Sequence, residues 1–236
     1  MIHSKFINVE VFNFSLNCSE NKRQYFYQLL SDEEKDRAGR YRFDIHRDRF
    51  ITGRGTIREI LAHMGNTKPH LIKFEVNSYG KPAINVPERL TGVKFNASSS
   101  HDMGVIALAN NNDLGIDIEH VKLNSSIEDF DAIVRGEFTQ EEHDGYNAQT
   151  RQDKAKRFYT LWTCKEAYLK ALGIGLNEKL NSFSISFKHQ HPVISKTSLE
   201  DSSRSKYSLY QLMSPEKYIT CLVIPGNEFK VNLTNW

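Results

Sequence analysis

Cysteine is scarce in this sequence, and the few cysteines are far apart. The 236 residues contain three, Cys18, Cys164 and Cys221, an odd number with no CxxC pair. A disulfide framework or a structural zinc site needs cysteines in pairs, so this spacing argues against both. We therefore expect a protein of a reducing compartment, the cytoplasm.

Long hydrophobic runs are also absent. The longest apolar stretches are only a few residues long, whereas a membrane span needs about 20 consecutive apolar residues. The first ten residues include Lys5 and Glu10 and contain no apolar segment of the signal-peptide kind. The pattern predicts neither membrane contact nor secretion.

Neither sign of charge dominates the chain. Lysine and arginine together number 31 against 29 acidic residues, a net charge of +2, which indicates no nucleic-acid partner. Seven of the 13 arginines nevertheless fall within 22 residues: Arg37, Arg40, Arg42, Arg47, Arg49, Arg54 and Arg58. Such a patch can hold phosphates by bidentate hydrogen bonds. A solvated helix face, whose arginines pair with the acids at 32–36, is the alternative.

Helix and strand signals divide the chain into two similar halves. The first half is predicted to contain a strand, three helices and three strands, at 4–14, 22–30, 32–41, 45–62, 71–76, 93–97 and 103–109. The second half is predicted to contain a strand at 114–118, a helical stretch with a capping box at Thr139 and Glu142, a long helix at 154–172 and strands at 183–187, 207–212 and 219–224. Turn-forming residues gather at 79–82 and 98–102.

This pattern predicts an α+β fold. We expect two similar, pseudo-symmetric lobes, residues 1–112 and 113–236, each with a long helix and a small, mainly antiparallel sheet. A functional site is expected in the cleft between them.

Acidic and apolar residues alternate in the strand at 114–118 and just beyond it. Because alternate side chains of a strand share a side, Ile116 and Ile118 are expected in the core, while Asp117 and Glu119 point together the other way. Taken alone, this pattern is more typical of the wet side of an edge strand.

A third acid lies on the long helix. Helical spacing places Trp162, Glu166 and Lys170 on one face. Glu166 together with Asp117 and Glu119 would offer the carboxylate oxygens that Mg²⁺ prefers. Glu166 and Lys170 are also explained as an ordinary surface pair at i,i+4.

Four motifs occur in order along the chain. They are Gly80-Lys81-Pro82, Phe95-Asn96-Ala97-Ser98, Gly115-Ile116-Asp117-Ile118-Glu119 and Trp162-x-x-Lys165-Glu166-Ala167-x-x-x-Lys170-x-x-Gly173. In this order they resemble the signatures of the Sfp-type 4′-phosphopantetheinyl transferases. Segments 34–37 and 53–58 are similar to the basic N-terminal helices of that family, so the resemblance covers about 31–186.

The resemblance implies transfer of the 4′-phosphopantetheine arm from coenzyme A to a serine of an apo acyl or peptidyl carrier protein, with release of 3′,5′-ADP. Mg²⁺, or alternatively Mn²⁺, would be held by Asp117, Glu119 and Glu166. Glu166, Lys170 and Asp117 would be catalytic, with Glu166 or a metal-bound water as the base. The implied coenzyme A site comprises Arg37, Lys81, Pro82, Ser98, Ser99, His101 and Lys170. The family also implies a monomer.

One position departs from the family pattern. Where the family has Phe-Asn-x-Ser-His, this chain has Ser99 in place of the histidine. That histidine helps to hold the 3′-phosphate of coenzyme A, so the contact should be weakened or altered here, and His101 is a candidate substitute. Trp162 is expected to support the helix, and Lys165 to contact phosphate or carrier.

Two other functions remain as alternatives: a metal-dependent phosphohydrolase or nuclease, and a non-catalytic relative that binds coenzyme A or a carrier. A carrier surface is expected over 127–156. Its apolar stripe of Ile127, Phe130, Ile133 and Val134 either contacts the carrier or faces the core. Carriers of fatty acid, polyketide, peptide and lysine synthesis are all candidates.

Overall fold

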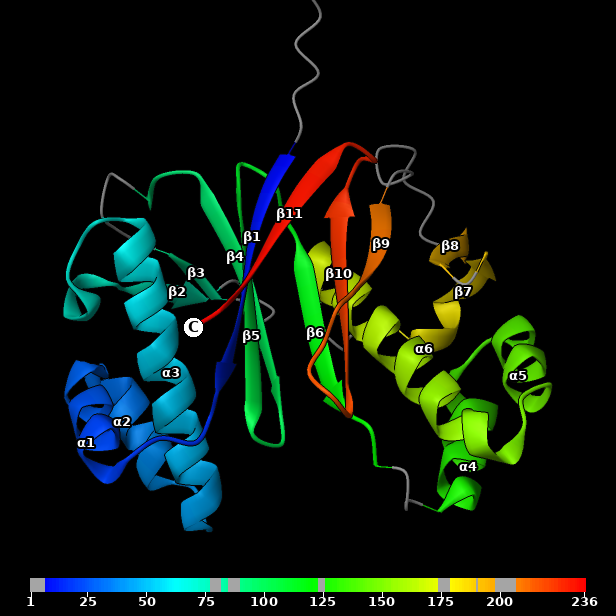
Figure 1. Ribbon diagram of the computed structural model, residues 1–236, viewed down its shortest axis with the longest axis horizontal. Helices are drawn as coiled ribbons and strands as arrows, with labels where there is room; N and C mark the ends of the chain where they lie inside the picture. The colour runs from blue at the N-terminus through cyan, green and yellow to red at the C-terminus, as the bar shows by residue number, and fades with distance from the viewer. Residues whose placement is uncertain are drawn as a thin grey trace, which may run out of the picture.

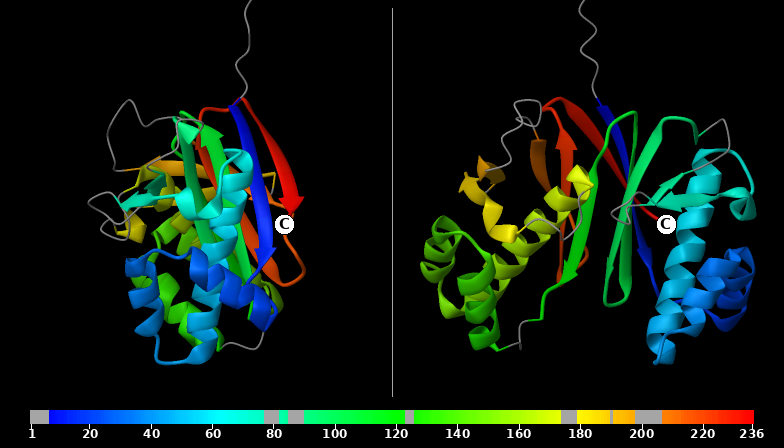
Figure 2. Two further views of the ribbon diagram at one scale, coloured as in Figure 1. Left: turned by 90° about the vertical axis from the view of Figure 1, so that its left-hand side faces the viewer. Right: turned by 180° about the vertical axis from the view of Figure 1, so that it is seen from behind.

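The structure is a computed structural model that describes residues 7–76, 82–84, 90–122, 126–173, 179–189, 191–197 and 207–236. Helices lie on both flanks of the molecule and strands fill the middle (Figure 1). Figure 2 shows the same arrangement, with the helices of the N-terminal half on one flank and those of the C-terminal half on the other. The predicted α+β class is confirmed. No described helix combines the length and hydropathy that a bilayer crossing requires.

Three helices form the N-terminal flank. They are α1 (Glu20–Leu29), α2 (Asp32–Gly39) and α3 (Asp44–Met64). The Ser19 hydroxyl accepts from a backbone N–H at the start of α1, and Ser31 and Glu34 form a capping box at the start of α2. These oxygens satisfy N–H groups that the first helical turn leaves unpaired, which is why both helices begin where they do.

A four-stranded sheet packs against α3. Its spatial order is β11 (Phe229–Asn235), β1 (Ile7–Ser15), β5 (Met103–Asn110) and β4 (Val93–Ser100). Phe12 and Phe14 of β1 lie in the core shared with Ile60 of α3. Val9 and Val11 point to the other side of the same strand, as strand alternation requires, and enter a second core.

A three-stranded antiparallel sheet forms the other side of that second core. Its order is β6 (Gly115–His120), β10 (Tyr218–Pro225) and β9 (Tyr207–Leu212). Ile116 and Ile118 are fully buried there, as predicted. The opposite face of this sheet packs on α6 (Arg151–Leu172), which is covered by α4 (Ile127–Glu137) and α5 (Gln140–Asn147).

Short elements complete the fold. They are the 3-10 helices η1 (Pro69–Leu71) and η4 (Leu180–Ser182), the hairpin of β2 (Phe74–Val76) and β3 (Pro82–Ile84), and the hairpin of β7 (Phe183–Lys188) and β8 (His191–Thr197). The strand predicted at 71–76 is therefore shorter, because Pro69 begins a 3-10 turn that occupies its first residue.

The final strand was missed from the sequence. β11 pairs in parallel with β1, with Ile7 opposite Phe229, so the C-terminus returns to the sheet of the N-terminal half. The ring of Trp236 packs edge-on against Phe12 at 5.6 Å. Phe229, Val231 and Leu233 alternate with polar residues, so the strand pattern is present in the sequence although most of β11 is exposed.

The turn predicted at 98–102 is shorter in the structure. β4 continues through Ser100, and only His101 and Asp102 connect it to β5, with His101 at φ 54°. The serine hydroxyls find partners on β6 instead of on their own backbone. The run of serines is therefore a polar strand edge, and its side chains alternate between two faces.

Candidate active site

Side chains of β4 join it to β6 where the two sheets meet. Ile116 N donates to Asn96 Oδ1 at 2.9 Å, and Ser98 Oγ donates to Asp117 Oδ1 at 2.7 Å. Ser100 Oγ donates to Glu119 Oε2, also at 2.7 Å. Alternate residues of β4 thus hold three residues of β6, and both carboxylates of β6 lie on the face that meets β4.

The long helix α6 comes unusually close to β6. A Cβ atom at Gly115 would lie 2.0 Å from the carbonyl oxygen of Ala167 and 2.4 Å from the nitrogen of Ala171. Only glycine allows this approach, so the first residue of the Gly-Ile-Asp-Ile-Glu motif determines how near the helix lies. Lys170 then reaches the strand.

Lys170, Asp117 and Ser98 form one hydrogen-bonded cluster. Lys170 Nζ donates to Asp117 Oδ1 at 2.6 Å and to Ser98 Oγ at 2.8 Å. Asp117 is only 3% exposed, whereas about a quarter of the Lys170 side chain is open to solvent. A half-open lysine beside a buried carboxylate is placed to meet an anion that enters from solvent.

The three carboxylates share one electrostatic neighbourhood. Burial raises the pKa of Glu166, the charges of Asp117 and Glu119 raise it further, and Lys170 opposes them. Burial also raises the pKa of Glu119, the hydrogen bond from Ser100 lowers it, and the charge of Asp117 raises it. Lys170, with Lys122 acting on Glu119, opposes three acids, so negative charge is in excess here.

Carboxylate oxygens in this neighbourhood fit a divalent cation by their chemistry. Asp117 Oδ2 and Glu166 Oε1 are buried and have no hydrogen-bond partner, and a cation would satisfy such oxygens. In the part of the chain that the structure describes, however, no three carboxylate, imidazole or thiol groups form a finished metal centre. The ligand set of Asp117, Glu119 and Glu166 therefore stays a prediction.

The raised pKa of Glu166 has a consequence for stability. A carboxyl group whose folded pKa lies above its unfolded value contributes less stability as the pH rises through the folded pKa. At pH 7, without added metal, Glu166→Gln should therefore have a higher Tm than the wild type. The difference should shrink as the pH falls below the raised pKa. Glu137→Gln, at an exposed site, is the control for thermal unfolding, and a lower Tm for Glu166→Gln at pH 7 would contradict the assignment.

A basic cavity of about 260 Å³ adjoins the carboxylate cluster. Its polar lining consists of Arg37, Arg49, Arg54, Ser98 and Ser99. Ser98 belongs to both sites, because its hydroxyl also bonds Asp117. The Nε atom of Arg49 is buried without a hydrogen-bond partner. An unpaired guanidinium nitrogen at a cavity wall indicates an anion as the natural occupant.

The arginine-rich segment serves two purposes. Arg58 pairs with Glu34 at 2.7 Å, as the ion-pair alternative expects, but it is 3% exposed and not solvated. Arg47 pairs with Asp44 at 3.0 Å, outside the acids at 32–36. Within the described ranges no carboxylate lies at ion-pair distance from Arg37 or Arg49. These two arginines line the cavity and match the phosphate-binding alternative.

Comparisons with known proteins match both halves of the chain. Residues 113–223 match the model of the 4′-phosphopantetheinyl transferase superfamily, and residues 16–112 match that of the N-terminal region of 4′-phosphopantetheinyl transferases. The 4′-phosphopantetheinyl transferase HetI of Nostoc sp. is 30% identical over 218 residues, which cover 92% of this chain and 88% of that protein. The chain belongs to the 4′-phosphopantetheinyl transferase family.

Another similar protein is also named a 4′-phosphopantetheinyl transferase, and one solved structure is similar over part of the chain. The 4′-phosphopantetheinyl transferase Sfp of Bacillus subtilis is 29% identical over 210 residues, 89% of this chain and 88% of its own length. Among solved structures, the holo-[acyl-carrier-protein] synthase of Thermotoga maritima covers 48% of this transferase, and this chain covers 62% of it. The identity is 18% and the TM-score 0.40.

Other residues predicted for coenzyme A lie elsewhere or outside the described ranges. His101 Nδ1 pairs with Asp102 Oδ1 at 3.1 Å, and its ring stacks on that of His120 with 4.8 Å between centroids. It does not line the basic cavity of this transferase, so the structure does not bring it to the position of the missing family histidine. Pro82 begins β3, and Lys81 lies outside the described residues.

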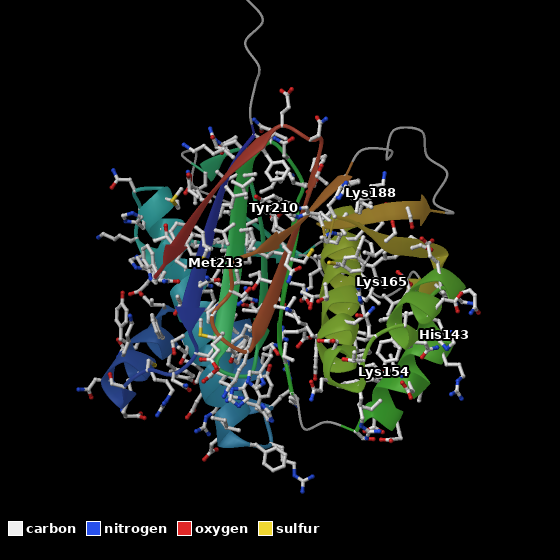
Figure 3. The ribbon with its side chains drawn as sticks, turned by 45° about the vertical axis from the view of Figure 1, so that its right-hand side comes forward. His143, Lys154, Lys165, Lys188, Tyr210 and Met213 are labelled. Atoms are coloured by element: carbon white, nitrogen blue, oxygen red, sulfur yellow. The ribbon has the colours of Figure 1, made fainter. Side chains whose placement is uncertain are left out.

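The prediction for Lys165 is wrong. This side chain is 0% exposed, so it cannot contact phosphate or carrier. Its Nζ atom pairs with Glu142 Oε1 at 2.8 Å and donates to the carbonyl oxygens of Leu180 and Phe183. Lys165 instead ties α6 to α5 and to the start of β7 (Figure 3). In this transferase Lys165 is therefore a buried structural link.

The apolar stripe of α4 faces the core. Phe130 and Val134 are buried, and the ring of Phe130 stacks on Phe158 of α6 with 4.4 Å between centroids. Ile133 packs on the same core from a partly buried position, as does Trp162, which supports the helix as predicted. The carrier surface expected over 127–156 thus has no exposed apolar stripe at Phe130 and Val134.

Proposed function

We propose that this protein transfers the 4′-phosphopantetheine arm of coenzyme A to a serine hydroxyl of an apo acyl or peptidyl carrier protein and releases 3′,5′-ADP. Family membership supports phosphopantetheinyl transfer. The observation that carries the proposal is Ser98, which lines the arginine-rich cavity and also bonds Asp117. A nucleotide anion and an acidic reaction centre would then meet at one residue.

The basic cavity would hold the nucleotide. Arg37 and Arg49 have no carboxylate partner among the described residues, so their charge is available to phosphate groups, with the Ser99 hydroxyl as a further donor. Three arginines around one cavity concentrate positive potential and draw the anion in. Without the family histidine, we expect Arg49 to carry more of the phosphate binding.

The carboxylate cluster would carry out the transfer. The serine oxygen of the carrier forms a bond to phosphorus, the bond to the 3′,5′-ADP oxygen breaks, and the serine proton passes to a base. Lys170 faces the leaving phosphate and neutralises its charge. Mg²⁺ or Mn²⁺ bound by Asp117, Glu166 and Glu119 would supply charge neutralisation at the pyrophosphate.

Glu166 is the proposed base. Burial and the neighbouring acids raise its pKa, so it accepts a proton more readily than an ordinary glutamate. Residues 1–112 would mainly bind nucleotide and residues 113–236 would supply the carboxylates. The protein would act as a cytoplasmic monomer.

Mass spectrometry tests the function directly. An apo carrier incubated with the protein, coenzyme A and Mg²⁺ should gain about 340 Da, the mass of the arm. The same carrier with its serine replaced by alanine should gain nothing. Hydrolysis of coenzyme A without a gain in carrier mass would favour the phosphohydrolase alternative. Binding without either reaction would favour the non-catalytic one.

A further inference from the structure

Ser100 lies at the end of β4, outside the residues that line the basic cavity. Its Oγ atom accepts a hydrogen bond from the backbone N–H of His120 at 3.0 Å and donates to Glu119 Oε2 at 2.7 Å. A serine hydroxyl carries one hydrogen. Because the N–H of His120 occupies an acceptor position of the oxygen, that hydrogen is directed at the Glu119 carboxylate.

This bond matters because β4 and β6 belong to different sheets. No ladder of backbone hydrogen bonds fixes their mutual position, so side chains have to do it. Asn96 holds Ile116 and Ser98 holds Asp117, one and two residues into the strand. Ser100 continues the same series at Glu119, where β6 is about to end.

Glu119 needs such support more than Asp117 does. Asp117 is held by both Lys170 and Ser98, whereas the hydrogen bond from Ser100 is the one that the described structure gives to the Glu119 carboxylate. A glutamate also has one more rotatable bond than an aspartate, so its unrestrained carboxylate samples more positions.

We propose that Ser100 is a positioning residue, which holds the Glu119 carboxylate where it can share a divalent cation with Asp117 and Glu166. This inference rests on the metal site of the proposed function. Residues that orient a ligand typically alter metal affinity 10-fold to 100-fold when they are replaced.

Binding of Mn²⁺ to the full-length protein, measured from the electron spin resonance signal of the free ion, tests this role apart from catalysis. We expect Ser100→Ala to weaken Mn²⁺ binding by about 10-fold. Ser100→Thr keeps the hydroxyl and suits a strand, so it should restore most of the affinity. The matched control is Ser195→Ala on the remote β7–β8 hairpin, which removes the hydrogen bonds from this hydroxyl to Glu141 and to the carbonyl oxygen of Ser184 and should change nothing.

Kinetics give a second readout. Ser100→Ala should raise the Mg²⁺ concentration for half-maximal transfer by a similar factor, while the KM for coenzyme A at saturating Mg²⁺ stays unchanged. A merely structural role would lower activity at every Mg²⁺ concentration. The Tm should fall by about 4–8 °C, since two hydrogen bonds are lost, the one from the His120 N–H and the one to Glu119.

Each result has a definite meaning. Wild-type affinity in Ser100→Ala, or equal loss in the alanine and threonine variants, overturns the inference. A wild-type protein that binds no Mn²⁺ also overturns it. If the wild type binds Mn²⁺ and responds to the variants as expected but transfers no arm to any carrier, the proposed function fails and the role of Ser100 stands.

Discussion

Asp117→Asn is expected to lower kcat for arm transfer by about 1000-fold while the protein stays folded. Asparagine keeps the shape of the side chain but removes the charge at the centre of the cluster. Lys170 then loses its counter-ion. The buried oxygen without a hydrogen-bond partner, Asp117 Oδ2, becomes either an uncharged amide oxygen or an amide nitrogen, and it binds a cation less well. Loss of one preorganised electrostatic group in an active site typically has an effect of this size.

The chain provides a matched control for this variant. Asp131 Oδ1 accepts from the hydroxyl of Tyr146 at 2.8 Å and from Lys154 Nζ at 3.1 Å, the same combination of hydroxyl and lysine that Asp117 has. At saturating carrier, Asp131→Asn should leave kcat within about twofold of the wild type, because rates respond to groups that interact with the transition state. Near-wild-type turnover of Asp117→Asn, with circular dichroism unchanged, would remove Asp117 from the reaction centre.

Local patterns predicted much of the fold. The alternation at 116–119 placed two isoleucines in the core, and the capping box at Thr139 and Glu142 is present as expected. These features succeed because their causes lie within a few residues of each other, where helix and strand periodicity act directly on the sequence. The long helix predicted at 154–172 is of the same kind, and it is present as Arg151–Leu172.

Features with distant causes were not predictable in this way. Serines at 98–100 are turn formers by preference, but here they pair with residues 103–105 of β5, and two of their hydroxyls bond carboxylates 19 residues away. Lysine is almost never fully buried, so an exposed role for Lys165 was the natural expectation. Its burial depends on Glu142 and on two carbonyl groups that the chain brings together only when α5, α6 and β7 pack.

The basic segment shows the same limit within one helix. Sequence alone could not separate Arg58, which a buried glutamate satisfies, from Arg49, whose Nε atom has no partner. The two arginines are nine positions apart on α3 and have similar neighbours in the sequence. What distinguishes them is which surface of the helix packs against the rest of the molecule, and that depends on tertiary structure.

Gly115→Ala should both unfold the protein at lower temperature and separate the catalytic groups. The new Cβ would meet the backbone of α6 at 2.0 Å, and backbone cannot rotate away as a side chain can. Overpacking of this kind costs about 3 kcal/mol or more, which corresponds to a Tm lower by about 6–12 °C. Any protein that still folds must hold α6 farther from β6.

That displacement would act directly on the cluster. The clash falls at Ala167 and Ala171, the immediate neighbours of Glu166 and Lys170, so the 2.6 Å contact between Lys170 and Asp117 should be lost. A shift of about 1 Å in such a group can lower a rate 100-fold, and transfer at a temperature where the variant is folded should fall by about that factor. Gly136→Ala makes the same change in α4, where nothing lies within 4 Å, and should raise stability by about 0.5–1 kcal/mol. Equal Tm values for the two variants would show that the close approach of α6 to β6 does not exist in solution.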